Sequence, residues 1–402
     1  TFMVGPAGAP YAVRGEGALV WDDTGRELID LNANFTTLIH GHAQPEIVAA
    51  ATAALERGSS FGLPNEAELD HAERLLARLP HADRVRYANS GTEAVMTALR
   101  VARAHTGRSR TILVRSAYHG TSDAVLAAGD RRSWRGLPES VRAETTLLPL
   151  NDVDALREAI AREGSRTAAV LVDLMANRSG LIPATREFAH ALADLCAEWG
   201  ILLVADEVIS FRLAHAGRAS DYGLAPDLTV LGKLIGGGLP VGAIAGRAEV
   251  MAELDPQRPD GLEHGGTFSG NPVTMAAGSV ALDLFDRAAV DRLNGLGRRF
   301  ADVLRPRVEA AGWELRGDGS LWRPWPLSPD GESPGALQLA VWWASYERGV
   351  LLNPTGLIAL TTPLDEPLVD DAAARVAEAV EAVANGWRPS GASRPGPAPA
   401  EA

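Results

Sequence analysis

The stretch SGTEA, residues 90–94, places two hydroxyl side chains and a glycine directly before a run with the apolar spacing of a helix. Backbone N–H groups in the first turn of a helix, together with small polar side chains, form a binding site for a phosphate group. The same residues also suit an ordinary helix that Thr92 caps and that packs on the core through Val95 and Leu99. The stretch alone therefore leaves phosphate binding and simple capping open.

Two charged residues stand at the ends of apolar runs that are typical of buried strands. Asp206 ends the run GILLVAD, and Lys233 ends the run DLTVLGK. An ionised side chain carries a large desolvation cost in such a position unless it is paired. Desolvation would lower the pKa of the Lys233 amine and favour Schiff-base chemistry. Taken alone, Asp206 suits a helix cap or a structural ion pair equally well.

These features together suit pyridoxal 5'-phosphate (PLP) as a cofactor. PLP carries a phosphate, a pyridine nitrogen that a carboxylate can hold in its protonated form, and an aldehyde that a lysine amine can bind. The sequence therefore predicts a PLP site at residues 90–92, Asp206 and Lys233.

The elements that must position these residues follow from the pattern of apolar runs. Between residues 46 and 285, short apolar runs alternate with longer amphipathic ones, which is typical of a largely parallel sheet covered by helices. Ligands of such sheets bind beyond the carboxyl ends of the strands. The candidate residues stand directly after the runs VRYA at Val85, TILV at Thr111, AAVLVDL at Ala168, ILLVAD at Ile201 and LTVLG at Leu228.

The domain organisation that we expect has four parts. Residues 1–45 contain a hairpin over residues 19–31 and pack with a small domain; residues 46–285 form the large PLP-binding domain. Residues 286–389 form the C-terminal small domain, which ends in an amphipathic helix over residues 372–387. Its Trp-rich stretch is either domain core or the rim of a substrate entrance. Residues 390–402 are rich in Pro, Ala and Gly and are expected to be a flexible tail.

The composition of the chain argues against some classes of binding partner and indicates the compartment in which the protein works. The chain has 402 residues and a net charge of −13, which argues against nucleic acid or an anionic membrane as a partner. Its single cysteine, Cys196, cannot form an intramolecular disulfide, and a reducing cytoplasmic setting fits best. His40, His42 and His119 have no spacing with carboxylates that is typical of a metal site.

Several longer motifs occur in an order that resembles one family, the class III aminotransferases of PLP fold type I, and within it most closely the glutamate-1-semialdehyde aminomutases. The motifs are GHAQPEI at Gly41, GSSFGLP at Gly58, NSGTEAVMTALRVARAHTGR at Asn89, YHG at Tyr118, LLVADEV at Leu202, YGLAPDLTVLGKLIGGGLPVGA at Tyr222 and GGTFSGNPVTMAAG at Gly265. The resemblance implies an α/β fold: a large domain with a mostly parallel seven-stranded sheet flanked by helices, and a smaller α+β domain.

The resemblance also implies the roles of the residues around the cofactor ring. Lys233 would bind the cofactor aldehyde and, once the substrate displaces it, carry a proton between the substrate Cα and the cofactor C4′. Asp206 would keep the pyridine nitrogen protonated. Val208 would pack on one face of the ring and Tyr118 would stack on the other, although Tyr118 could instead belong to the core. His119 could touch the cofactor or be an ordinary hydrogen-bonded histidine.

At the cofactor phosphate, the resemblance implies binding by Ser90, Gly91 and Thr92. Thr267 resembles a second phosphate ligand, which family members typically take from the partner subunit, although it could be a simple turn residue. The expected partner is therefore a second copy of the chain, in a homodimer whose active site is shared across the interface.

The chain departs from the family pattern where relatives contact their substrate. Asp173 and Leu174 replace the usual Glu-Pro pair, and Arg178 follows where relatives have an Asn or Glu near the substrate. Arg178 could bind a substrate carboxylate bidentately, or form a surface ion pair. Phe61, in the motif GSSFGLP, is the second candidate substrate residue. The stretch LLNPTGLIALTTPL lacks the arginine with which many relatives bind an α-carboxylate.

These departures weaken the case for a glutamate-semialdehyde substrate. The sequence therefore favours an aminotransferase that moves an amino group from a small-molecule donor to a carbonyl acceptor, in specialised biosynthesis. An aminomutase, which moves the amino group within one molecule, is the alternative. A PLP-binding protein without turnover is a minor one.

Overall fold

The computed structural model describes residues 10–389 except residues 130, 179 and 328–331, so the predicted tail at residues 390–402 lies outside the described residues. The chain divides into two compact units. One comprises the described residues of Glu46–Val290, and the other those of Thr1–Pro45 and Asp291–Ala402. Within the described residues, no helix combines the length and the apolar character needed to cross a membrane.

The larger unit is built on a seven-stranded sheet with the strand order β4-β12-β11-β10-β7-β5-β6. All neighbouring pairs are parallel except those of β12, which is antiparallel to β11 and to β4. This confirms the predicted, mostly parallel seven-stranded sheet. The strands are β4 (Arg84–Ala88), β5 (Arg110–Val114), β6 (Thr145–Leu148), β7 (Thr167–Val172), β10 (Leu202–Asp206), β11 (Leu228–Gly232) and β12 (Gly242–Gly246).

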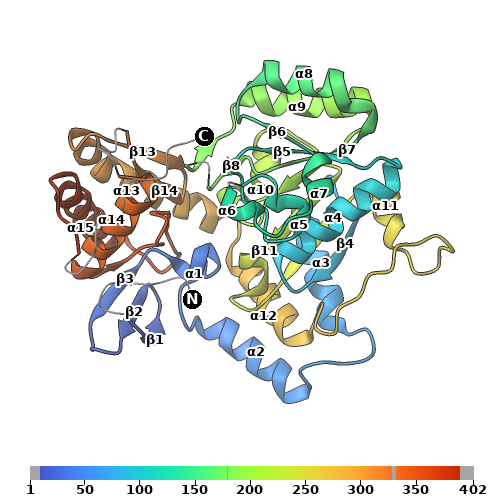
Figure 1. Ribbon diagram of the computed structural model, residues 1–402. Coiled ribbons are helices and arrows are strands. Elements are labelled where there is room, and N and C mark those ends of the chain that lie inside the picture. The colour runs from blue at the N-terminus through green and yellow to red at the C-terminus, as the bar shows by residue number, and fades with distance from the viewer. Residues whose placement is uncertain (1–9, 130, 179, 328–331, 390–402) are drawn as a thin grey trace. The chain divides into compact units, whose positions relative to one another are not determined.

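Helices cover both faces of this sheet because successive strand residues point to opposite faces. On β7, Val170 and Val172 belong to the apolar core beneath α8 (Val153–Glu163) and α9 (Arg186–Trp199), which lie together in Figure 1. Ala169 and Leu171 belong to the core beneath α4 (Gly91–Thr106) on the other face. The central strands are therefore buried on both sides, which explains their continuous apolar runs.

The remaining elements of the larger unit connect the strands or pack beside them. They are α2 (Pro45–Arg57), α3 (Glu66–Arg78), α5 (Asp123–Leu126), α6 (Arg131–Trp134), α7 (Glu139–Ala143), η1 (Gly164–Arg166), β8 (Met175–Ala176), β9 (Ile182–Pro183), η2 (Ser210–Leu213), α10 (Gly217–Asp221), η3 (Lys233–Gly236), α11 (Ala248–Met251), η4 (Ala252–Leu254) and α12 (Pro272–Leu284). The next helix, α13 (Arg287–Ala310), begins in this unit, and most of its residues belong to the smaller one.

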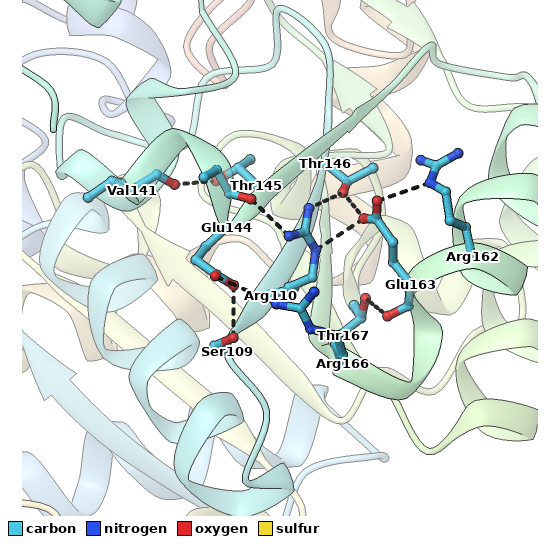
Figure 2. A network of polar contacts seen from close by, with 11 residues as sticks. Ser109, Arg110, Val141, Glu144, Thr145, Thr146, Arg162, Glu163, Arg166 and Thr167 are labelled. Atoms are coloured by element: carbon cyan, nitrogen blue, oxygen red, sulfur yellow. Dashed lines mark hydrogen bonds and ion pairs between the residues drawn. The ribbon is translucent and has the colours of Figure 1, made fainter. Parts of the chain in front are cut away.

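A network of polar contacts links the N-terminal ends of β5, β6 and β7, at the edge of the sheet opposite the carboxyl ends of the strands. Figure 2 shows Arg110 at the start of β5, where its Nε lies 3.1 Å from Glu163 Oε2 and its Nη2 donates to Thr146 Oγ1 at 3.2 Å. Burial would raise the pKa of Glu163, but hydrogen bonds from Thr146 and Arg162 and the charge of Arg110 lower it overall. The network aligns β5, β6 and β7, so their other ends meet at one edge.

The smaller unit contains a four-stranded and a three-stranded sheet. The hairpin predicted over residues 19–31 is present, because β2 and β3 pair antiparallel. Trp322 and Trp342 are buried, and Trp342 Nε1 donates to Leu352 O at 2.8 Å, which favours the core reading of the Trp-rich stretch. The elements are β1 (Ala12–Glu16), β2 (Leu19–Asp22), β3 (Glu27–Asp30), α1 (Ala33–Thr36), β13 (Trp313–Asp318), β14 (Leu321–Pro326), α14 (Pro334–Glu347), β15 (Val350–Leu351), β16 (Ile358–Ala359) and α15 (Glu366–Ala384).

The last helix begins earlier than the sequence pattern predicted. α15 starts at Glu366 instead of residue 372, because the Asp365 side chain caps it by accepting the N–H of Leu368 at 2.9 Å. Pro367 in the first turn has no N–H to lose there and suits that position. The cap and the proline were thus the boundary signals, and the apolar periodicity alone placed the start too late.

Candidate active site

The loop before α4 has the geometry of an anion site. Ser90 is the N-cap: its backbone is extended, and its Oγ accepts the N–H of Glu93 at 3.2 Å. The expectation that Thr92 caps the helix was therefore wrong, because Thr92 already lies inside the first turn. The N–H groups of Gly91 and Thr92 belong to that first turn, which has no intrahelical acceptors for them. Ser90, Gly91 and Thr92 thus stand together at the positive end of a 16-residue helix.

Close packing around this loop leaves room for only small residues. A Cβ built on Gly91 would lie 3.0 Å from Val208 Cγ2, so Val208 packs directly on the loop. Gly120 has φ +96°, and a Cβ there would lie 2.5 Å from Thr92 Oγ1. The structure therefore brings the segments after β4, β5 and β10 against one another around Thr92.

Asp206, at the end of β10, has one hydrogen bond on each carboxylate oxygen. His119 Nδ1 lies 2.7 Å from Oδ2, and the Val208 N–H donates to Oδ1 at 3.1 Å. An ionised Asp206 accepts both bonds if His119 carries its proton on Nδ1. The pair holds the carboxylate in one orientation.

The His119 side chain is fully buried, and its Nε2 has no hydrogen-bond partner among the described residues. Buried polar atoms of this kind usually have a partner, and an orphan calls for an explanation such as a bound group or ordered water. The sequence left open whether His119 touches a cofactor or is an ordinary hydrogen-bonded histidine. The structure shows the hydrogen bond to Asp206, and contact with a cofactor stays a prediction.

Asp173, which the sequence analysis noted only as a departure from the family pattern, is buried beside this pair. Its Oδ1 accepts the N–H of Met175 at 2.9 Å. Burial and the negative charge of Asp206 raise the pKa of Asp173 to about 6. The end of a fully buried strand was the sequence signal that could have identified it, as it did for Asp206.

Lys233 begins η3 directly after β11. Burial lowers the pKa of its amine, although the carboxylates of Asp206 and Asp173 oppose the change. Its φ of 53° lies in the left-handed region, which costs a non-glycine residue about 1–2 kcal/mol. Strain of this kind is typical of functional sites. The backbone therefore holds an amine with a lowered pKa within range of the negative charges of two carboxylates.

Tyr118 and Arg178 form a pair at the same edge of the sheet. The guanidinium carbon of Arg178 lies 4.1 Å from the centroid of the Tyr118 ring, a cation–π geometry. Arg178 is exposed, and within the described part of the chain it forms no ion pair with a carboxylate. The surface ion pair that the sequence left open is thus not seen there, while the Tyr118 ring fixes the position of the guanidinium.

Phe61 and Thr267 lie on exposed loops of the larger unit. The Phe61 side chain is 52% exposed, and its ring lies over Gly58, where an added Cβ would be 2.7 Å from Cζ. Thr267 is exposed between η4 and α12. The structure joins neither side chain to the Asp206–His119 pair, and their functions stay predictions.

Glu207 was not singled out from the sequence. Its two carboxylate oxygens accept the N–H groups of Arg218 and Ala219, each at 2.7 Å, at the first turn of α10. Burial raises the pKa of Glu207 to about 7, while these two backbone hydrogen bonds oppose the rise. Glu207 thereby anchors the segment that follows Asp206 to α10.

The arrangement fits PLP on its own chemistry. A helix N-terminus can hold a phosphate, a fixed carboxylate can hold a protonated ring nitrogen, and a buried amine can bind an aldehyde. The orphaned Nε2 of His119 and the tight cradle around Thr92 are consistent with a bound group at this edge.

Comparison with known proteins identifies the family. Residues 7–382 match the family described as aminotransferase class III. The chain is similar to two proteins named glutamate-1-semialdehyde 2,1-aminomutase. The protein from Desulforudis audaxviator is 39% identical over 371 residues, which are 87% of this chain and 85% of the relative. The protein from Alkaliphilus metalliredigens is 42% identical over 283 residues, which are 68% of this chain and 64% of the relative, somewhat less than two thirds of it.

Solved structures show the same architecture. An ω-transaminase from Sphaerobacter thermophilus matches with a TM-score of 0.89 and 37% identity over 94% of this chain and 92% of that protein. A β-phenylalanine aminotransferase from Variovorax paradoxus matches with a TM-score of 0.85 and 34% identity, over 92% and 87% of the two chains. The fold is thus that of PLP-dependent transaminases. The chain belongs to the class III aminotransferases, a family of PLP-dependent enzymes.

Proposed function

We propose that this protein is an aminotransferase that takes an amino group from a carboxylate-bearing donor and passes it to a separate carbonyl acceptor. The observation that carries the proposal is the half-buried Lys233 side chain directly after β11, whose amine has a pKa that burial lowers and that the negative charges of Asp206 and Asp173 raise. Lowering the pKa of an amine increases the fraction of it that can act as a nucleophile or a base.

Each residue of the site has a part in this chemistry. Bound PLP supplies an electron sink that stabilises a carbanion at the substrate Cα. Asp206, held by His119, keeps a proton on the ring nitrogen. Lys233 would bind the cofactor aldehyde and, once released from it, would move the proton between the substrate Cα and the cofactor C4′. Val208 and Tyr118 confine the ring between them.

The cofactor phosphate is bound, in this proposal, by the loop Ser90, Gly91 and Thr92 of one subunit and by Thr267 of the partner subunit. The protein is accordingly a homodimer whose active sites are shared. A cavity of about 440 Å³ supports an interface on the larger unit. It is lined by Leu55 and Phe268, whose side chains are 59% and 63% exposed. Exposed apolar side chains around a cavity are typical of a surface that another protein covers.

The substrate is bound, in this proposal, through its carboxylate by Arg178, with Phe61 beside its apolar part. Arg178 supports this assignment because it has a fixed position on Tyr118 and no ion pair within the described residues. The C-terminal stretch that lacks the family arginine makes another carboxylate ligand necessary. One structural relative is named for β-phenylalanine, a donor that carries both a carboxylate and an aromatic ring.

A single-turnover experiment tests the proposed function. The purified protein is loaded with PLP and mixed with amino donors, including β-phenylalanine, L-alanine and L-glutamate, without an acceptor. We expect about one equivalent of oxo product per site as the visible band of the bound cofactor is lost. The Lys233→Ala variant should still bind the cofactor, and it should release no oxo product over the time in which the wild type completes one turnover.

The two other functions would give different results. An aminomutase would isomerise an amino aldehyde, keep a labelled amino group within the same molecule and release no oxo acid. Similarity to the aminomutases keeps this candidate in the test. A non-catalytic PLP protein would give neither result, and Lys233→Ala would keep its biological function. The lone cysteine, buried Cys196, is consistent with a reducing, cytoplasmic setting.

A further inference from the structure

The loop that carries Thr267 is held by an arginine on a neighbouring strand. Arg86, on β4, donates from Nε to His264 Nδ1 at 3.1 Å and from Nη2 to the His264 carbonyl at 2.9 Å. Two bonds from one planar guanidinium fix both the position and the orientation of His264. His264 lies three residues before Thr267, so Arg86 fixes the start of the loop.

The rest of the loop is fastened from two further elements. Asn65, the N-cap of α3, donates from Nδ2 to the Gly270 carbonyl at 3.4 Å. Asn89, directly before the phosphate loop at Ser90, donates from Nδ2 to Ser269 Oγ at 3.4 Å. These two bonds are longer and single. Arg100 on α4 adds one shorter bond, from Nη1 to the Glu263 carbonyl at 2.8 Å, whereas Arg86 attaches the loop by two bonds.

A polar cavity of about 190 Å³ lies beneath the loop, lined by Glu68, Arg86, His264 and Ser269 among others. Burial raises the pKa of Glu68, and the charge of Arg86 opposes the rise. Burial and the charges of Arg86 and Arg100 lower the pKa of His264, which keeps Nδ1 free to accept the bond from Arg86. The exposed Thr267 hydroxyl therefore stands on a loop with a rigid polar support.

We propose that Arg86 is a positioning residue for phosphate recognition: it holds His264 and thereby places Thr267 where it meets the cofactor phosphate of the partner subunit. This inference rests on the proposed function, since it takes PLP as the cofactor and Thr267 as a ligand in a shared site. In this proposal, Arg86 on β4 of one subunit contributes to cofactor binding in the partner subunit.

The experiment measures how much the phosphate contributes to cofactor affinity. The apoprotein is titrated with PLP and, separately, with pyridoxal, which has the aldehyde and no phosphate; the ratio of the two Kd values is compared between variants. A hydrogen bond to a charged group is worth roughly 1.5–3 kcal/mol, about a 10- to 150-fold change in affinity. We expect Thr267→Ala and Arg86→Gln each to lower the preference for PLP about 10-fold or more, with pyridoxal affinity unchanged.

The double variant separates a path through Thr267 from an independent effect. If Arg86 acts through Thr267, Arg86→Gln combined with Thr267→Ala lowers the preference no further than Thr267→Ala alone. Arg84→Gln is the matched control, because Arg84 lies two residues earlier on the same strand and is exposed. His264→Ala provides a second route to the same prediction if Arg86→Gln does not fold.

The possible failures are distinguishable. Equal loss of PLP and pyridoxal affinity in Arg86→Gln would mean a general structural role and would overturn the inference. The inference would also be overturned if Thr267→Ala lowered the preference for PLP over pyridoxal while Arg86→Gln and His264→Ala left it unchanged. That result would still support the shared phosphate site. An unchanged preference in Thr267→Ala would overturn both the shared phosphate site and the inference.

Discussion

At the scale of single residues, the chemistry that we propose depends on charged groups that are wholly or partly buried. Asp206 has each carboxylate oxygen occupied, by His119 Nδ1 at 2.7 Å and by the Val208 N–H at 3.1 Å. Burial lowers the pKa of Lys233, while the nearby carboxylates limit the change. The exposed charge of Arg178 is different, because among the described residues it lies over the Tyr118 ring and pairs with no carboxylate.

Arg178 is expected to distinguish donors by their carboxylate. Arg178→Gln should raise the KM for β-phenylalanine about 10- to 100-fold, since a bidentate charged contact is lost. It should leave the KM for 1-phenylethylamine, the same donor without its carboxylate, nearly unchanged. Steady-state kinetics with the two donors provide the measurement.

Arg142→Gln is the control for the Arg178 variant. Arg142 also stacks on an aromatic ring, that of Trp134 at 5.4 Å, but stands near the start of β6, away from the carboxyl edge. Neither donor should respond to this change. A similar rise in KM for both donors in Arg178→Gln would show that Arg178 acts through Tyr118 or the fold and does not bind the carboxylate.

At the scale of elements, a buried histidine joins three parts of the larger unit beside the site. His71 on α3 has its Nδ1 2.6 Å from the Tyr87 hydroxyl on β4 and its Nε2 2.7 Å from the Ile235 carbonyl in η3. η3 begins with Lys233, so this histidine holds the segment that carries the amine proposed to react.

This brace predicts a pH-dependent stability. Burial lowers the pKa of His71 from 6.5 to about 4. Between these pH values the unfolded chain binds a proton that the folded protein does not, so His71 makes the protein less stable as the pH falls from 6.5 to 4. The loss should reach about 3 kcal/mol near pH 4.

Urea unfolding at several pH values checks this prediction. His71→Gln can keep both hydrogen bonds without titrating, so its free energy of unfolding should fall less steeply over that range than the wild type's. Parallel curves for the two proteins would rule out the assignment. His190→Gln is a control, because His190 bonds the Tyr222 carbonyl at 2.8 Å and is exposed.

At the scale of the whole molecule, assembly and cofactor binding are linked if the sites are shared. Because each chain has a net charge of −13, two copies repel each other electrostatically, and the free energy of their association must come from buried apolar surface. The exposed Leu55 and Phe268 around one cavity provide such area.

Leu55→Glu is expected to weaken the dimer by about 100-fold or more, because a carboxylate would have to be desolvated on association. PLP affinity should fall with it, since the monomer lacks the partner's Thr267. Sedimentation at several concentrations, with cofactor titration on the same samples, gives both values. Leu327→Glu is the matched control: Leu327 is also 59% exposed but lies in the smaller unit. A wild-type monomer that binds PLP tightly would contradict the shared site.

Much of the architecture could be read from local patterns. The continuous apolar runs predicted a mostly parallel sheet, because strands buried on both faces have no polar side to display. Asp206 and Lys233 could be selected because each ends such a run. The choice of Thr92 as the helix cap was wrong, since Ser90 and Thr92 have equal capping chemistry and only the backbone conformation distinguishes them.

The sequence by itself determined the kind of chemistry and the edge of the sheet where it occurs, because residue type and position at a strand end are local properties. Tertiary structure alone decided which groups touch: His119 meets Asp206 across 87 positions, and Arg86 meets His264 across 178. Such contacts depend on strand order and loop closure, which no local pattern encodes. The packing of the whole fold therefore decides how the Asp206 carboxylate is oriented and how the loop proposed to bind phosphate is supported.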